Sequence, residues 1–532
     1  MLRISKRLAE LRQRRKFVLT VTPFVAVFLA FANTVTLRSS IIGLAVLIIY
    51  MVANGDVLGR AFFEHERPFF RLIFGLFAFI VILALAGIAA VFVVMNESWY
   101  LFGMVFAAGF TFFSSLFFAR YESARLKEDE KNRDRKFTFN VTYVCYVTYA
   151  TLLAWSFLIL LSVRSGWVRG PIWEVVPSIF LPVYFAATAV LVATVLLGNE
   201  VHNQLALIVL HSLFSLSFIF IVSYPGIIFY DPWYDLGRAR TLQPVASLVR
   251  QLFPTGSMTP FWVSEGALSF IRVLNMFLRG VTEHSLIATF AGILNIDMFW
   301  SYLLLLPVLW GLFVPVTSYR IAEMIGLGRK TSVLAAVLTI PNLQFLAWGK
   351  LTEATSMGVL FFVFTLYMLI LVLSLGTSRR IYLMILLTLF ALLATHFVPA
   401  LVAFSLLVLV FAFREYDRVR LKSSVLGYFT LLASFLIFLF ALPSLVIFRG
   451  VLLPMIGTSA FSIENLLNTS IWAFVSGISE NLPVYDAALY EIYPLLGLLG
   501  LIYTLRSKTK LNKRLCLFFF LALLASLIQF RV

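Results

Sequence analysis

The sequence predicts an all-α membrane protein, a bundle of about fifteen transmembrane helices. Of its 532 residues, 61% are hydrophobic and only 13% are charged, whereas soluble domains carry roughly 25% charged residues. Apolar runs near the roughly 20 residues needed to cross a bilayer recur along the chain, and the charges lie between them. We expect helices because lipid cannot hydrogen-bond an open backbone.

The expected spans follow directly from these apolar runs. They are 17–35, 40–54, 72–95, 98–118, 141–163, 172–198, 204–229, 298–318, 331–347, 356–376, 381–395, 397–413, 424–448, 487–505 and 515–530. The basic run Met1–Lys16 precedes the first span without a small-residue cleavage site, which predicts a retained signal anchor.

The basic residues predict the orientation in the cell membrane. With the N-terminus in the cytoplasm and the spans alternating, 31 of the 42 Lys and Arg residues fall in cytoplasmic segments, as the positive-inside rule requires. The net charge of +17 is therefore explained by short loops, and it does not indicate a nucleic-acid partner. The largest external segment is then 230–297.

The chain divides near its seventh span. Residues 1–203 hold six spans joined by short loops with little chemistry, which predicts an accessory membrane module. Residues 204–532 carry the long external segments 230–297 and 449–486, which predicts the catalytic membrane core.

Tyr230–Arg238 opens the largest external loop and holds the strongest candidate site. Asp231 and Asp235 are four residues apart, so on a short helix starting at Pro232 their carboxylates lie near one face. The pair could hold a divalent cation such as Mg²⁺ or Mn²⁺, or one carboxylate could act as a general base. Two structural alternatives stay open: Asp231 caps that helix, or the run is an interfacial aromatic belt.

Other groups on the same predicted face complete the candidate site. Segment 262–279 is amphipathic and too interrupted to span, which predicts a helix on the outer leaflet. Arg272 there meets a phosphate group or snorkels to the lipid surface. His396, in a short external turn, is a catalytic or a structural imidazole. The predicted substrate-binding residues are Arg238, Arg240, Arg272, Lys350 and Glu353.

The order of these features resembles the GT-C superfamily of integral-membrane glycosyltransferases, in its prokaryotic or archaeal form. The resemblance covers roughly 204–505. After the acidic motif of the first large external loop, the segments that resemble the family are 319–330, Ile340–Asn342, Thr352–Ala354, Thr395–Pro399 and Tyr493–Leu501.

The resemblance implies an inverting glycosyltransferase that uses a polyprenyl-phosphate-linked sugar on the external face. A glycan, lipid or protein would be the acceptor, with membrane lipids around it, and the family's first-loop carboxylate carries over to Asp231 or Asp235. Three features depart from the family: the acids are four apart, six spans precede the core, and no sizeable soluble domain follows, so the chain could be a fragment. The Trp-Trp-Asp motif of oligosaccharyltransferases is missing from the sequence.

A non-enzymatic transporter or flippase for lipid-linked glycans, or a membrane scaffold, is the alternative. A flippase needs a polar cavity that reaches into the membrane. In this sequence the charged residues fall in loops or at the ends of the predicted spans, which favours the enzyme.

Overall fold

The computed structural model describes a little over half of the chain. The described residues are 21–93, 99–117, 141–162, 177–198, 200–223, 281–340, 354–375, 379–396 and four short stretches between 399 and 411. They belong to two compact units, and the larger one contains the described residues up to Phe364 together with 379–396. The contacts and sites described below lie within this larger unit.

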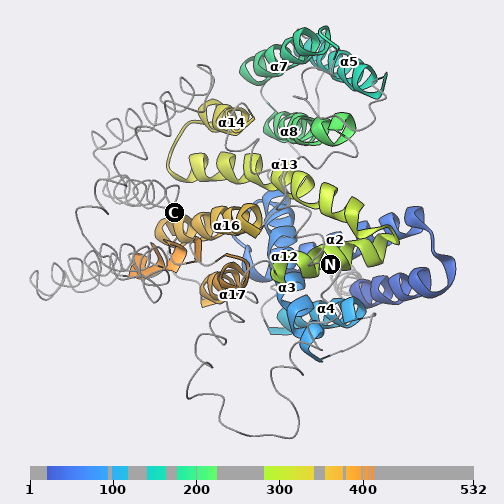
Figure 1. Ribbon diagram of the computed structural model, residues 1–532. Helices are drawn as coiled ribbons and strands as arrows, with labels where there is room; N and C mark the ends of the chain where they lie inside the picture. Colours follow the sequence, from blue (N-terminus) through green and yellow to red (C-terminus); the bar gives the residue numbers. More distant parts are fainter. Residues whose placement is uncertain are drawn as a thin grey trace, which may run out of the picture. The chain divides into compact units, whose positions relative to one another are not determined.

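Every regular element among the described residues is a helix (Figure 1). The helix from Val21 ends in the π-helical turn η1 (Asn33–Leu37). The others are α2 (Ser40–Phe62), α3 (Pro68–Val93), α4 (Trp99–Phe117), α5 (Val141–Ser162), α7 (Phe180–Leu197), α8 (Val201–Ser223), α12 (Val281–Leu294), α13 (Met298–Met324), α14 (Arg329–Val337), α16 (Ala354–Leu375) and α17 (Arg379–Thr395).

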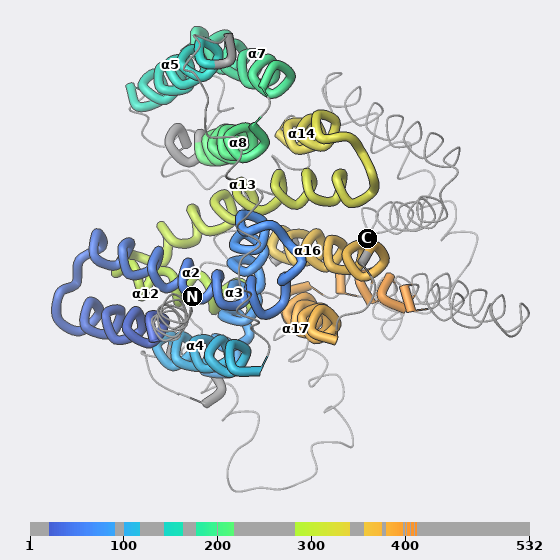
Figure 2. Tube along the Cα trace, turned by 180° about the vertical axis from the view of Figure 1, so that it is seen from behind, coloured from blue at the N-terminus to red at the C-terminus, as the bar shows by residue number. Residues whose placement is uncertain are grey.

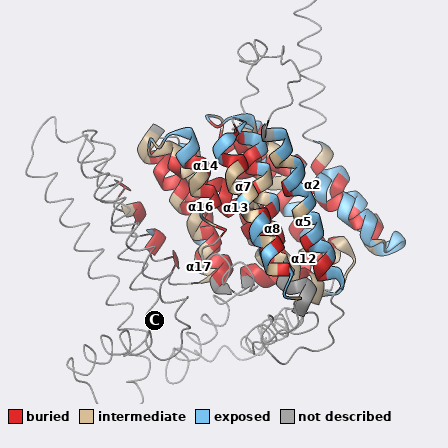
Figure 3. Ribbon diagram, turned by 90° about the horizontal axis from the view of Figure 1, so that it is seen from above, coloured by how far each residue is buried: buried red, intermediate tan, exposed pale blue. Residues whose placement is uncertain are grey.

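Seven of these helices are long and apolar enough to cross a membrane, namely the larger parts of α2, α3, α4, α5, α7, α13 and α16. The prediction of an all-α membrane protein is therefore confirmed for the described residues. Figure 3 shows buried residues on the sides where helices meet and exposed residues on the outward sides of α2 and α5. The total of about fifteen spans stays a prediction.

Two helices differ from the expectation. Segment 331–347 was expected to span, but α14 has nine residues and ends at Val337, followed by a turn to Ile340. Segment 230–297 was expected to be an external loop with interfacial helices, and its last part forms α12, whose residues are mostly buried rather than at a surface. α12 packs against α2, α3, α4, α13 and α17.

Glycines set the close crossing of α2 and α3. A Cβ atom added to Gly75 would clash with the carbonyl oxygen of Gly55, and one added to Gly59 would clash with that of Arg71. Gly55 and Gly59 form a G-x-x-x-G pair, the spacing that lets two membrane helices approach through their backbones.

Aromatic rings join α3 to the helices on its other side. The ring of Phe77 stacks on Phe313 of α13 at 4.3 Å and on Phe364 of α16 at 4.2 Å between centroids. All three side chains are buried. Such offset stacking adds specific geometry to the area that the rings bury.

Helices α5, α7 and α8 form a second packed group, and α8 lies along α13 (Figures 1 and 2). Contacts cross the predicted boundary at residue 203, since α2 and α3 pack on α12 and α17. The division into 1–203 and 204–532 stays a prediction, because helix contacts alone do not reveal which part folds independently.

Candidate functional site

The first turn of α12 places four polar side chains inside the bundle. Thr282, Glu283 and Ser285 have no exposed surface, and His284 is 3% exposed. Ionisable residues buried in a membrane protein are costly and usually functional. Glu283 also lies in the first helical turn, where a carboxylate complements the positive end of the helix dipole.

Hydrogen bonds fix this turn between two neighbouring helices. The Ser285 hydroxyl shares its hydrogen between the Thr282 carbonyl of its own helix, at 2.8 Å, and the Ala84 carbonyl of α3, at 3.2 Å, and the Thr282 hydroxyl donates to the Ala391 carbonyl of α17 at 3.4 Å. On the side of α13, Ser301 donates to the Ile287 carbonyl at 2.8 Å. The polar turn is therefore tied to α3 and α17.

The opposite end of α12 lies against helix ends. Asn33 in η1 donates to the Ile293 carbonyl at 3.4 Å, and Ser40 at the start of α2 donates to the Asn295 carbonyl at 3.3 Å. In contrast, Ser285 at the start of α12 contacts Ala84, which lies nine residues before Val93, the end of α3. Nine residues correspond to about 14 Å along the helix axis. Helix α12 thus extends from the end of the bundle into its interior, and Glu283 and His284 lie at the inner end of α12.

His396 is the one predicted site residue whose position the structure describes. It follows α17, its backbone N–H donates to the Leu392 carbonyl at 2.7 Å, and its side chain is half-buried. The Ala391 carbonyl that Thr282 contacts is five residues earlier, about 7.5 Å along the axis. Thr282 of segment 230–297 therefore contacts α17 five residues before His396.

The other predicted site residues lie outside the described residues. They are Asp231, Asp235, Arg238, Arg240, Arg272, Lys350 and Glu353. Within the described part of the chain, no three His, Cys, Asp or Glu side chains gather in a way that could hold a metal ion. The cation site predicted at Asp231 and Asp235 stays a prediction.

Sequence reasoning placed Glu283 and His284 on the outer face but left them out of the site. The signal was present: the polar run Thr282–Ser285 comes directly before the mostly apolar stretch 286–294. That pattern predicts a short helix with a polar start.

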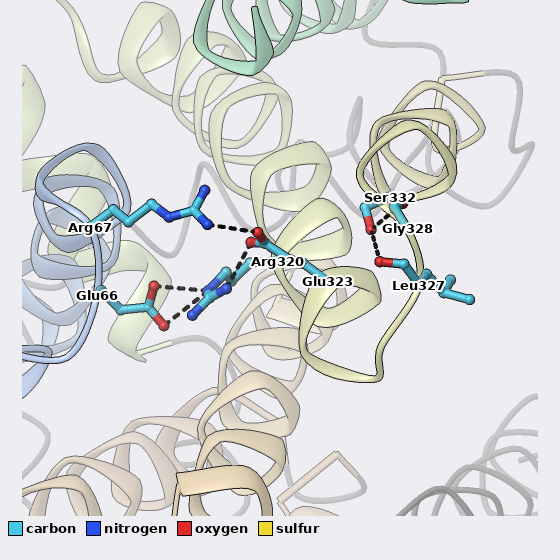
Figure 4. Close-up of polar contacts among 7 residues, drawn as sticks. All are labelled: Glu66, Arg67, Arg320, Glu323, Leu327, Gly328 and Ser332. Atoms are coloured by element: carbon cyan, nitrogen blue, oxygen red, sulfur yellow. Dashed lines mark hydrogen bonds and ion pairs between the residues drawn. The ribbon is translucent and has the colours of Figure 1, made fainter. Parts of the chain in front are cut away.

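A second polar cluster, the ion-pair cluster of Glu66, Arg67, Arg320 and Glu323, lies elsewhere in the same unit (Figure 4). Arg320 Nε donates to both carboxylate oxygens of Glu66, at 2.8 and 3.0 Å, and Arg320 Nη1 donates to Glu323 at 2.7 Å. Arg67 reaches the same Glu323 at 3.1 Å. The side chain of Glu66 is fully buried and that of Arg320 is 16% exposed.

These charges join segments that are far apart in sequence. Glu66 and Arg320 are 254 residues apart, and nearby Glu64 pairs with Arg380 at the start of α17 at 3.1 Å. Segment 55–71 thus contacts both 319–330 and Arg380, and the charge pattern assigns all of these to one side of the membrane. Since each charge of the cluster faces an opposite one, its arrangement is that of a cross-link.

Comparison with protein-family models, with curated proteins and with solved structures finds no match to this chain. The helices by themselves define its class, a multi-pass α-helical membrane protein. Within that class, the inner end of α12 together with His396 is the candidate functional site.

Proposed function

We propose that the protein is a membrane glycosyltransferase that moves a sugar from a polyprenyl-phosphate-linked donor to an acceptor on the external face, with inversion. The observation that carries the proposal is the contact from Thr282 to Ala391. It joins Thr282, which belongs to the predicted external segment 230–297, to α17, the helix that ends beside His396. The GT-C resemblance assigns segment 230–297 and the turn of His396 to one site, and this contact supports that assignment.

The proposed reaction is a single displacement. The acceptor hydroxyl or amide attacks the anomeric carbon, the bond from that carbon to the phosphate oxygen breaks, and the polyprenyl phosphate leaves. Asp231 or Asp235 accepts the acceptor's proton. Arginine or lysine side chains of the external loops, with or without a divalent cation, stabilise the charge on the departing phosphate.

Glu283 and His284 are added to this site as positioning residues. Both directly follow Thr282 in the sequence and both are buried. They lie in the turn that connects the predicted external segment to the bundle. A carboxylate and an imidazole at that point can orient the catalytic loop and fix the protonation state of a neighbouring group.

The test is sugar transfer by the full-length protein in liposomes, with a labelled polyprenyl-phosphate sugar and the membrane's own lipids and glycans as acceptors. Asp231→Asn or Asp235→Asn should lower transfer by about 100-fold or more. Glu200→Gln is the control, because Glu200 is exposed and its carboxylate accepts a hydrogen bond from the neighbouring Asn203 side chain at 2.6 Å. If both Asp variants transfer sugar as fast as this control, the site is assigned wrongly.

One observation favours the alternative, a flippase for lipid-linked glycans. The sequence argues against transport because it keeps charges at span ends, yet Glu283 has no exposed surface inside the bundle. The two functions separate in acceptor-free liposomes. A flippase moves a labelled lipid-linked sugar between leaflets there, whereas the glycosyltransferase leaves its distribution unchanged.

A further inference from the structure

His211 lies at the centre of the group formed by α5, α7 and α8, and it is fully buried. The ring of Tyr184 stacks on it at 5.1 Å with an interplanar angle of 14°, and the ring of Tyr149 lies 5.8 Å away, tilted by 46°. One helix contributes the imidazole, and each of the two others contributes an aromatic ring.

The hydrogen bonds around His211 determine its tautomer. Thr188 Oγ1 lies 3.0 Å from His211 Nε2 and 2.9 Å from the Tyr184 carbonyl. A threonine hydroxyl has one hydrogen, and a carbonyl can only accept, so we assign that hydrogen to the Tyr184 carbonyl, the shorter of the two contacts. The hydrogen in the contact with His211 must therefore come from Nε2. Neutral His211 consequently carries its proton on Nε2 and has a bare lone pair on Nδ1.

The other hydroxyl hydrogens nearby are also committed. Ser215 donates to the His211 carbonyl at 2.7 Å, so in its contact with Tyr184 the tyrosine is the donor. Tyr149 donates to the Leu207 carbonyl at 3.4 Å. Among the residues that the structure describes, Nδ1 of His211 has no hydrogen-bond partner. A buried acceptor without a donor requires an explanation.

We propose that His211 Nδ1 is a proton-binding site whose occupation loosens the packing of α5, α7 and α8. The proton comes from water at the membrane surface and adds to the lone pair, which converts the neutral imidazole to imidazolium without breaking a covalent bond. Nε2 keeps its bond to Thr188. The site is independent of the proposed sugar transfer.

The surroundings give this charge little compensation. Helices α5 and α7 contain no Asp, Glu, Lys or Arg, and their titratable groups at the imidazole are Tyr149 and Tyr184. On α13, Arg320 and Glu323 belong to the ion-pair cluster, and on α14 Lys330 donates to the Leu196 carbonyl. Arg329 also lies on α14.

The faces of the tyrosine rings attract the His211 imidazolium. A buried charge without an anion is nevertheless costly, so it favours entry of water or separation of the helices around it. Proton uptake therefore favours a looser arrangement of these three helices. The group is suited to this change, because much of α5 is exposed outside its contacts with α7 and α8.

Cys145 provides a native reporter of the packing. It lies on α5, one turn before Tyr149, and is half-buried. We suggest measuring its alkylation by N-ethylmaleimide in the full chain with Cys516→Ser, from about pH 8 to about pH 5. His211→Gln is the neutral reference, since the glutamine amide can still donate to Thr188. The ratio of the two rates cancels the pH dependence of the thiol itself.

The rate of Cys145 alkylation in the protein with His211, divided by the rate in the His211→Gln variant, should rise several-fold on acidification. His202→Gln is the matched control, because His202 lies on the same helix but is exposed and contacts Phe69. This control should follow the parent protein. Equal pH profiles for the parent and His211→Gln would overturn the proposal.

Nitrogen-15 NMR of ring-labelled histidine tests the tautomer without relying on packing. The signals lost in His211→Gln identify this residue. One bare and one protonated nitrogen at neutral pH, and two protonated nitrogens after acidification, are expected. A proton on Nδ1 at neutral pH, or a bare nitrogen that persists to the lowest pH at which the protein stays folded, would refute the site even if the variants fold poorly.

Discussion

The ion-pair cluster and the first turn of α12 are both polar regions within an apolar helix bundle, yet they are built differently. In the cluster, Glu66 and Glu323 flank Arg320, so the charges neutralise one another. In α12, a carboxylate and an imidazole are neighbours on a single helix, and the hydrogen bonds described for that turn come from Thr282 and Ser285. The first arrangement connects distant segments, and the second brings titratable groups to an enclosed position.

We propose that this difference separates a stability role for the ion-pair cluster from a functional role for the α12 turn. Breaking a buried ion pair leaves a charge without its partner, which costs folding free energy. Neutralising a titratable group at a site affects a reaction more than the fold. Substitutions in the ion-pair cluster should therefore lower stability more than sugar transfer. Substitutions in the α12 turn should lower sugar transfer more than stability.

The largest expected effect is on the ion-pair cluster. Arg320→Ala leaves the fully buried Glu66 without its cation, and we expect a loss of about 3–5 kcal/mol in the free energy of unfolding. Thermal unfolding in detergent measures it. The double variant Glu66→Met with Arg320→Met should be more stable than Arg320→Ala, since no buried charge remains. A double variant that is less stable than the single one would show that the cluster contributes more than charge compensation.

The next effect concerns the α12 turn. Glu283→Gln keeps the size of a fully buried side chain, so unfolding should change little while sugar transfer falls by about 100-fold. Transfer and unfolding are measured on the same preparation. Glu323→Gln is the comparison: it should lower stability and leave transfer unchanged in the surviving folded protein. A reversed pattern would exchange the roles of the two regions.

The smallest effect is expected at the exposed edge of the cluster. The side chain of Arg67 is 60% exposed, so its pair with Glu323 is screened by solvent. Arg67→Ala should cost less than about 1 kcal/mol in unfolding free energy, and the cost should shrink in high salt. A cost as large as that of Arg320→Ala would mean that the cluster acts as one cooperative unit.

Local sequence signals account for where several helices begin and end. Ser39 accepts a hydrogen bond from the Ile42 amide and caps α2, and Asp297 accepts one from the Phe299 amide and caps α13. After α13 the chain turns at Gly326, whose φ of +89° suits a residue without a side chain. These features depend on neighbours in sequence, so the sequence suffices to predict them.

The sequence by itself determined the class of the protein, because apolar segments of spanning length in lipid have no alternative to helices. It also indicated His396 and the outer acidic pair as candidates. Only the tertiary structure decided that α12 is buried and that α14 stops at Val337, since helices of 14 and nine residues are too short for hydropathy to place. It alone paired Glu66 with Arg320 and enclosed His211 between two tyrosines. Such contacts join side chains from separate helices, and their partners depend on how the helices pack, which the periodicity of one segment does not encode.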